Sequence, residues 1–118
     1  MRITWFSNSP FSATGYGNQT RLFTPLIKNL GHELQILAFH GHDNYTAPIN
    51  WGGIQINGRG FHPYGMDVVV ATANTFKSDI VLSLFDAWAF DWQVIRSGNT
   101  FTLLGSAGSL RTFSTSRW

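Results

Sequence analysis

Cysteine is absent from the 118 residues of this chain, and charged residues are scarce. Without cysteine the protein forms no disulfide and no cysteine-based metal site, which fits a reducing compartment. Charged residues make up 12% of the chain, whereas about a quarter is usual for a soluble domain. We therefore expect part of the surface to be covered by something else. Because no apolar run approaches a signal peptide or a membrane span, the sequence predicts a soluble cytoplasmic protein.

Basic residues are present but scattered. The formal net charge is +2, yet the eight Lys and Arg residues form no run or stripe, so we expect no nucleic-acid partner. The four histidines also lack the spacing of a metal site, because His40 and His42 have no identifiable third ligand. We therefore expect no metal ion. The length fits one small domain, and a hydrophobic content of 43% is enough to build its core.

The most informative segment runs from Met1 to Glu33 and reads as a strand, a glycine-bearing loop and a helix. The loop contains the run Gly15-Tyr16-Gly17-Asn18, and we expect the helix to begin where the glycines end. Five apolar residues share one helical face, and Gly31 is a natural stop: Leu22, Phe23, Leu26, Ile27 and Leu30. A helix start with unpaired backbone N–H groups binds anions readily. The alternative is a tight turn whose glycines only supply positive φ, and the sequence leaves both open.

The middle of the chain predicts further elements of an α/β fold. Residues 34–39 read as a buried strand parallel to the first, and Pro25 predicts a kink or a restart in the intervening helix. Residues 54–57 alternate like a short strand. Residues 68–76 fit either a strand or a helix, and we favour a helix capped by Asp67, because the buried strand at 79–85 needs a crossover before it.

The end of the chain changes in character. Residues 97–118 are rich in Ser, Thr and Gly and predict a weakly ordered tail, although residues 101–104 are compatible with a strand. We therefore expect a Rossmann-like, mostly parallel open sheet of three to four strands with flanking helices over residues 1–96.

Several segments resemble the N-terminal domain of family 4 glycosyltransferases, which have the GT-B fold. The opening MRITWFSNSPFSATGYGNQTRLF, together with Leu-Gly-His-Glu-Leu at 30–34, is similar to the first strand, glycine loop and helix of that family. Trp-Gly-Gly-Ile-Gln-Ile at 51–56 and Lys-Ser-Asp-Ile-Val-Leu-Ser-Leu-Phe-Asp-Ala-Trp at 77–88 are similar to its third and fourth strands. The resemblance covers roughly residues 1–96 and implies an incomplete N-terminal half of a GT-B fold.

The resemblance implies an enzyme that transfers a sugar, with retention, from a nucleotide-sugar donor to a sugar or glycoside acceptor. Gly15, Tyr16, Gly17 and Asn18 would then form the loop that closes over the donor phosphate and sugar. By position, Asp86 and Trp88 would face the acceptor-side cleft, with Arg59, His62 and Tyr64 leaning over it. No separate cofactor is implied.

The departures from the family are also informative. The chain has a single glutamate, Glu33, whereas family members usually carry a glutamate pair in a donor-binding second domain. We therefore expect a truncated or frame-shifted chain, inactive alone, whose missing half comes from a C-terminal domain or an oligomer partner. No catalytic residue is identifiable. Two alternatives remain, a non-catalytic α/β module that binds a nucleotide or phosphorylated small molecule, and an inactive fragment. Asp86 equally fits a helix cap, Trp88 fits packing, and Arg59 and Tyr64 fit ordinary loop residues.

Overall fold

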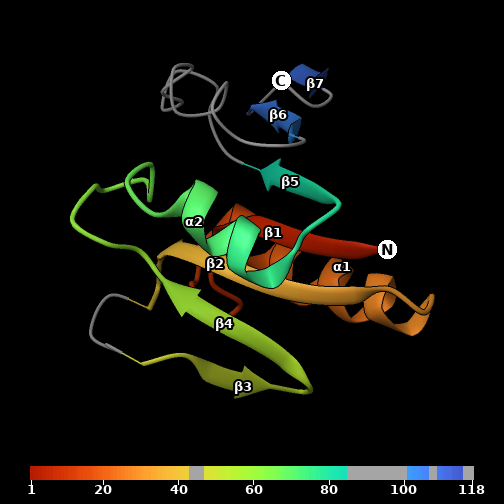
Figure 1. Cartoon of the computed structure of the whole chain (residues 1–118), viewed down its shortest axis with the longest axis horizontal. Coiled ribbons are helices and arrows are strands. Elements are labelled where there is room, and N and C mark those ends of the chain that lie inside the picture. The colour runs from red at the N-terminus through yellow and green to blue at the C-terminus, as the bar shows by residue number, and fades with distance from the viewer. Residues whose placement is uncertain (43–46, 85–100, 107–108, 116–118) are drawn as a thin grey trace.

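The computed structural model describes residues 1–42, 47–84, 101–106 and 109–115, where helices and strands follow one another in an α/β order (Figure 1). In chain order the elements are β1 (Arg2–Asn8), α1 (Gly15–Asn29), β2 (Glu33–His40), β3 (Ile49–Trp51), β4 (Ile54–Gly58), α2 (Val69–Phe76), β5 (Ile80–Leu84), β6 (Phe101–Ser106) and β7 (Ser109–Thr115). The α/β class and the expected elements between residues 2 and 84 are confirmed. Neither helix in these ranges is long and apolar enough to cross a lipid bilayer.

One sheet joins all the strands of the described ranges, in the order β3-β4-β2-β1-β5-β6-β7. β1 pairs in parallel with β2 and β5, and β4 and β6 extend this parallel run on either side. The edge strands β3 and β7 are antiparallel to their neighbours. The mostly parallel sheet is confirmed, but three to four strands are too few, since the described part of residues 1–96 contributes five, β1 to β5. Two more strands, β6 and β7, form where the composition predicts a weakly ordered tail.

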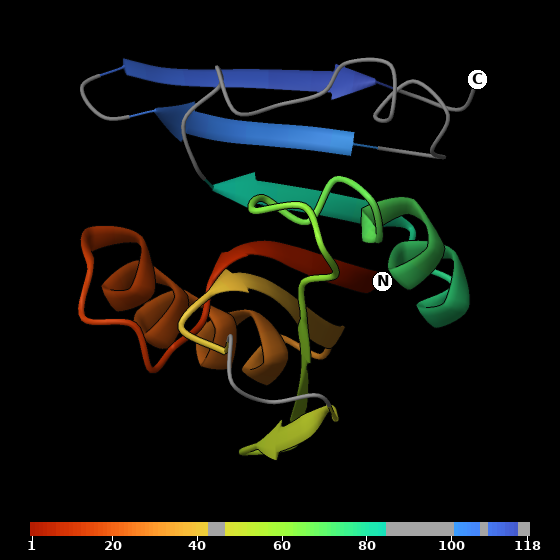
Figure 2. The same cartoon turned by 90° about the vertical axis from the view of Figure 1, so that its left-hand side faces the viewer.

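The two helices lie on opposite faces of the sheet (Figure 2). Successive side chains of a strand point to opposite faces, so β1, β2 and β5 each contribute to two separate clusters. On the α2 face, Phe6 and Leu37 pack with Val69. On the α1 face, Trp5 and Ile36 pack with other β-strand residues and with the partly buried Ile27.

Helix α1 exposes four of the five apolar residues that share one face in the sequence, and the fifth, Ile27, is partly buried against the sheet. The side chains of Leu22, Phe23, Leu26 and Leu30 are 65%, 47%, 58% and 77% exposed. The residues that α1 buries are small, namely Gly17, Thr20 and Thr24. Small side chains let the helix approach β1 closely, and the Thr20 hydroxyl accepts a hydrogen bond from the buried indole N–H of Trp5 at 2.9 Å. Close packing and a satisfied polar pair therefore outweigh the burial of the leucines.

The ends of the helices also differ in part from the expectations. Helix α1 begins at Gly15, so both glycines lie in its first turn and do not precede it. It continues through Pro25 without a restart and ends before Gly31, whose φ is +98°. The N-cap of α2 is Val68, not Asp67. The Asp67 carboxylate instead accepts hydrogen bonds from the backbone N–H groups of Phe61 and His62, at 2.7 and 3.3 Å.

Candidate functional site

A pocket of about 420 Å³ opens at the edge of the sheet where the parallel strands end. β1, β2 and β4 run in the same direction, so their carboxyl ends meet at this edge. Open α/β sheets bind ligands at such an edge. The lining residues come from these strand ends, from the start of α1 and from the loop after β4: Asn8, Thr14, Phe39, His40, Arg59, Pro63 and Tyr64. We call this the carboxyl-edge pocket.

The loop between β1 and α1 is fixed beside the pocket by its own hydrogen bonds. The Ser9 N–H donates to the His40 carbonyl at 2.8 Å, and the Ser9 hydroxyl donates to the Gly41 carbonyl at 3.1 Å. Gly41 has a φ of +87°, and a Cβ there would lie 2.8 Å from the Ser9 Oγ. Glycine is therefore required at this contact, and the ends of β1 and β2 are joined into one rigid rim.

In the run Gly15-Tyr16-Gly17-Asn18 at the start of α1, the backbone N–H groups of Gly17 and Asn18 already form hydrogen bonds within the chain. Thr14 is the N-cap, and its Oγ1 accepts a hydrogen bond from the Gly17 N–H at 3.1 Å. The Asn18 N–H donates to the Thr14 carbonyl, and the Asn18 Oδ1 accepts from the Arg21 guanidinium. Gly17 is buried, and a Cβ there would clash with the backbone of Ser12. The absence of a side chain at Gly17 thus serves the packing of α1 against its own loop.

Gly15 differs from Gly17 because a Cβ at this exposed residue would have no heavy atom within 4 Å. The space in front of the first turn is therefore open at Gly15. Tyr16 lies between the two glycines and packs partly buried against the apolar cluster on the α2 face. The role of Gly15, Tyr16, Gly17 and Asn18 as a phosphate loop remains a prediction, with Gly15 the member best placed to face a ligand.

Asn8 is the most unusual polar residue of the carboxyl-edge pocket. Its side chain is 6% exposed, and its Nδ2 donates to the Thr14 Oγ1 at 2.8 Å. Its Oδ1 is buried and accepts no hydrogen bond among the described residues. A buried carbonyl oxygen without a donor is costly, by roughly 1–3 kcal/mol. Asn8 is a residue that the sequence did not single out, and the available signal was a polar residue at the end of an otherwise apolar strand.

Of the three residues predicted from the sequence in the loop after β4, two line this pocket and one does not. Arg59 and Tyr64 line it, and the Tyr64 ring packs edge-on against Phe39 with centroids 5.6 Å apart. His62 is not among the lining residues, and its Nδ1 accepts a hydrogen bond from the Tyr64 N–H at 3.1 Å. His62 thus shapes the loop that presents Tyr64. Asp86 and Trp88 lie outside the described residues.

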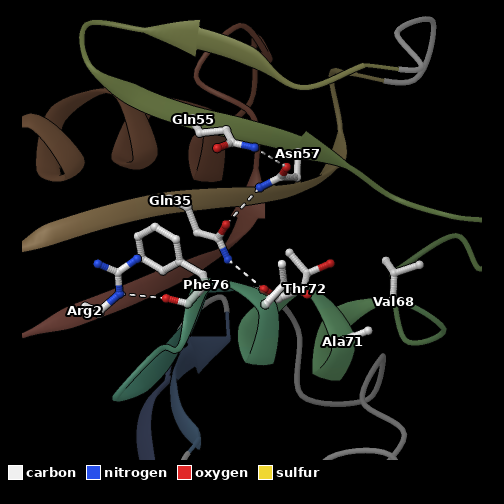
Figure 3. Close-up of a pocket in the computed structure, with 9 residues that line it drawn as sticks. Arg2, Gln35, Gln55, Asn57, Val68, Ala71, Thr72 and Phe76 are labelled. Carbon is white, nitrogen blue, oxygen red and sulfur yellow. Dashed lines mark hydrogen bonds between the residues drawn. The ribbon is translucent and has the colours of Figure 1, made fainter.

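A second pocket, of about 400 Å³, lies on the α2 face of the sheet and shares no lining residue with the first (Figure 3). Its most polar wall consists of carboxamide side chains from β2 and β4, namely Gln35, Gln55 and Asn57. Arg2, from the start of β1, and Phe76, from the end of α2, close one end. We call this the amide groove.

No group of three or more His, Asp or Glu side chains within the described ranges is arranged to hold a metal ion. Comparisons of the chain with protein-family models, with curated proteins and with solved structures give no match.

Proposed function

We propose that the chain is the N-terminal portion of a retaining glycosyltransferase and that the carboxyl-edge pocket receives part of the nucleotide-sugar donor or the sugar acceptor. The observation that carries this proposal is the pocket itself, because it combines the carboxyl ends of three parallel strands with the capped start of α1. That is the position at which open α/β sheets bind their ligands. The sequence resemblance described above supports the assignment to sugar transfer.

The lining residues supply chemistry that suits a phosphorylated sugar. The Arg59 guanidinium is a permanent cation whose fork of N–H groups matches phosphate oxygens. The N-terminus of α1 adds a partial positive charge near Gly15. The Asn8 Oδ1 lacks a donor, and a ligand hydroxyl would supply one after the carboxamide turns toward it. An anionic group and a hydroxyl group on one ligand would therefore both find partners.

Transfer itself requires more than this pocket. In the glycosyltransferase family that the sequence resembles, a second domain holds most of the donor. No catalytic group is assigned in this chain. We therefore propose that the chain alone binds a ligand without transferring the sugar. Gly15 would be the point of closest approach between the donor and α1, because space is open there.

A second candidate function is a non-catalytic module that binds a nucleotide or another phosphorylated small molecule. One observation favours it, namely that the cation Arg59 and the N-cap residue Thr14 line the carboxyl-edge pocket together. A cation and a helix N-terminus are both groups that bind phosphate. The two candidates therefore differ in which ligands the isolated chain recognises.

Calorimetric titration of the full chain distinguishes these candidates. The probes are UDP-glucose, GDP-mannose, the free nucleotides and glucose. Binding of free nucleotides as tight as that of nucleotide sugars favours the module, whereas recognition that depends on the sugar favours the glycosyltransferase. Absence of binding for every probe would contradict both.

The Arg59→Ala variant tests whether binding occurs in the carboxyl-edge pocket. Loss of a charge-assisted hydrogen bond to phosphate is worth roughly 1.5–3 kcal/mol, so we expect binding of a phosphorylated probe to weaken about tenfold or more. Lys28→Ala is the matched control, because it removes the same charge at the far end of α1, where the Lys28 ammonium donates to the Gly53 carbonyl. Equal weakening by both variants would indicate a general effect of charge and not a site at Arg59.

A further inference from the structure

The amide groove contains a continuous chain of side-chain hydrogen bonds that crosses two strands (Figure 3). The Gln55 Nε2 donates to the Asn57 Oδ1 at 3.0 Å, and the Asn57 Nδ2 donates to the Gln35 Oε1 at 3.0 Å. The Gln35 Nε2 then donates to the Thr4 Oγ1 at 2.8 Å and to the Thr72 carbonyl at 3.2 Å. The direction of every carboxamide is therefore fixed by its neighbour.

This polar row lies beside the apolar cluster on the α2 face of the sheet. Gln35 is 3% exposed and lies two residues before Leu37, which belongs to the apolar cluster on the same face. Short apolar side chains could cover this part of the sheet without needing any hydrogen-bond partner. Gln35 is the buried member of the row and must keep its partners, because an unpaired buried amide is costly. Asn57 is half-buried and Gln55 is exposed, so these two form the accessible part of the row.

The remaining hydrogen-bonding capacity of the row is balanced between donors and acceptors. A carboxamide carries two N–H donors and one carbonyl oxygen with two lone pairs. Gln35 uses both N–H groups, whereas Gln55 and Asn57 each use one within the row. Each of the latter two thus keeps an N–H donor and acceptor capacity that the row does not use. A hydroxyl group is both donor and acceptor, so a molecule with several adjacent hydroxyls matches this pattern.

The charge at the groove is compensated within the chain. Arg2 is paired with the Glu33 carboxylate, and its Nε donates to the Phe76 carbonyl at 2.7 Å. Its guanidinium carbon also lies 4.2 Å from the centroid of the Phe76 ring. An anionic ligand would have to compete with these contacts. The groove therefore favours a neutral ligand.

The opposite wall of the groove comes from α2 and the residue before it, and it mixes apolar with hydroxyl side chains. Val68 and Ala71 lie at one end of the groove and the Phe76 ring at the other, beside Arg2 (Figure 3). Thr72 and Thr75 also line this wall. A sugar ring presents hydroxyl groups at its edge and C–H groups on its faces. A wall of amides that faces both apolar groups and threonine hydroxyls is suited to such a ring.

We infer that the amide groove is a binding site for a neutral carbohydrate, separate from the carboxyl-edge pocket. The fixed row of Gln55 and Asn57 receives its hydroxyls, and Val68, Ala71 and Phe76 contact its C–H groups. This inference does not rest on the proposed function, because the groove shares no lining residue with the carboxyl-edge pocket.

Nuclear magnetic resonance of the full ¹⁵N-labelled chain tests the inference through the side-chain NH₂ signals of the carboxamides. Maltose, cellobiose and methyl α-mannoside are the probes, and sodium phosphate is the anionic control. We expect at least one sugar to shift the Gln55 and Asn57 signals in a saturable way, while phosphate leaves them in place. No saturable shift with any of the three sugars would overturn the inference, and so would a larger shift with phosphate.

The Gln55→Leu variant locates the binding. Gln55 is exposed, so its replacement leaves the core intact, and loss of one hydrogen bond to the sugar weakens binding about fivefold. Gln19→Leu is the matched control, since Gln19 is an exposed glutamine on α1, on the other face of the sheet. Arg59→Ala must also leave sugar binding at the groove unchanged. An affinity in Gln55→Leu equal to that of the unmodified chain would contradict the inference, whatever happens at the carboxyl-edge pocket.

Discussion

Replacing Gly17 with alanine should destabilise the protein, although the same change stabilises most helices. A Cβ at Gly17 would lie 2.9 Å from the Ser12 Cβ and 3.0 Å from the Ser12 carbonyl carbon, and closer still to the carbonyl oxygen. Ordinary contact begins near 3.4 Å, so the loop or the helix must move. Alanine gains about 1 kcal/mol of helix propensity over glycine. Overpacking against backbone typically costs about 1–3 kcal/mol, and movement would also stretch the cap between Thr14 and Gly17, worth about 1 kcal/mol.

The net expectation for Gly17→Ala is a loss of about 1–3 kcal/mol in the free energy of unfolding. Urea unfolding measures it as a lower midpoint with an unchanged slope. Gly15→Ala is the matched control in the same helical turn, because a Cβ there meets nothing within 4 Å. That variant should be neutral or more stable by up to about 1 kcal/mol. A Gly17→Ala protein as stable as the unmodified chain would refute the close packing of α1 against its loop.

Two further predictions use the same urea measurement. Thr20→Val removes the acceptor of the buried Trp5 indole N–H, so we expect a loss of about 1–3 kcal/mol. Thr24→Val, which removes only a hydroxyl that donates to the Thr20 carbonyl, should cost less, and the reverse order would contradict the role of Thr20. Leu26→Lys should change stability by no more than about 0.5 kcal/mol, because Leu26 is 58% exposed, whereas Leu37→Ala should cost about 2–5 kcal/mol. A large loss in Leu26→Lys would mean that α1 buries its leucines after all.

The strands β2 and β5 could be predicted because their sequences are largely apolar on both faces, whereas β4 could be predicted because apolar and polar residues alternate along it. β2 is buried at every residue except its two ends, and a continuous apolar run between glycines is typical of such a strand. The helix at 69–76 followed from the same reasoning, since a parallel strand after it requires a crossover. These predictions use the pattern of apolar residues over a whole segment. They therefore do not require knowledge of which residue any single side chain contacts.

The orientation of α1 and the cap of α2 could not be predicted in this way. A sequence pattern favours burial of the most apolar helical face, but here Thr20 forms specific hydrogen bonds that require it to face β1. The Asp67 carboxylate was equally well suited to a helix cap, yet it binds the backbone N–H groups of a preceding loop. Both outcomes depend on contacts between segments that are separate in the sequence. Arg59 and Tyr64, which the sequence singled out, both line the carboxyl-edge pocket, whereas the place of Asn8 there depends on its contact with Thr14.

The docking of α1 and the shape of the carboxyl-edge pocket depend on one network centred on Asn8. The Asn8 side chain donates to the Thr14 hydroxyl, which caps α1, and the Asn8 carbonyl accepts from the Thr20 hydroxyl at 2.9 Å. A shift of α1 along the sheet would therefore move a wall of the pocket as well as the core contact at Trp5. Substitutions at Thr20 should then affect stability and ligand binding together. Arg59 is exposed at the rim, so its replacement should reduce binding with a smaller loss in the free energy of unfolding than a substitution at the buried Thr20 causes.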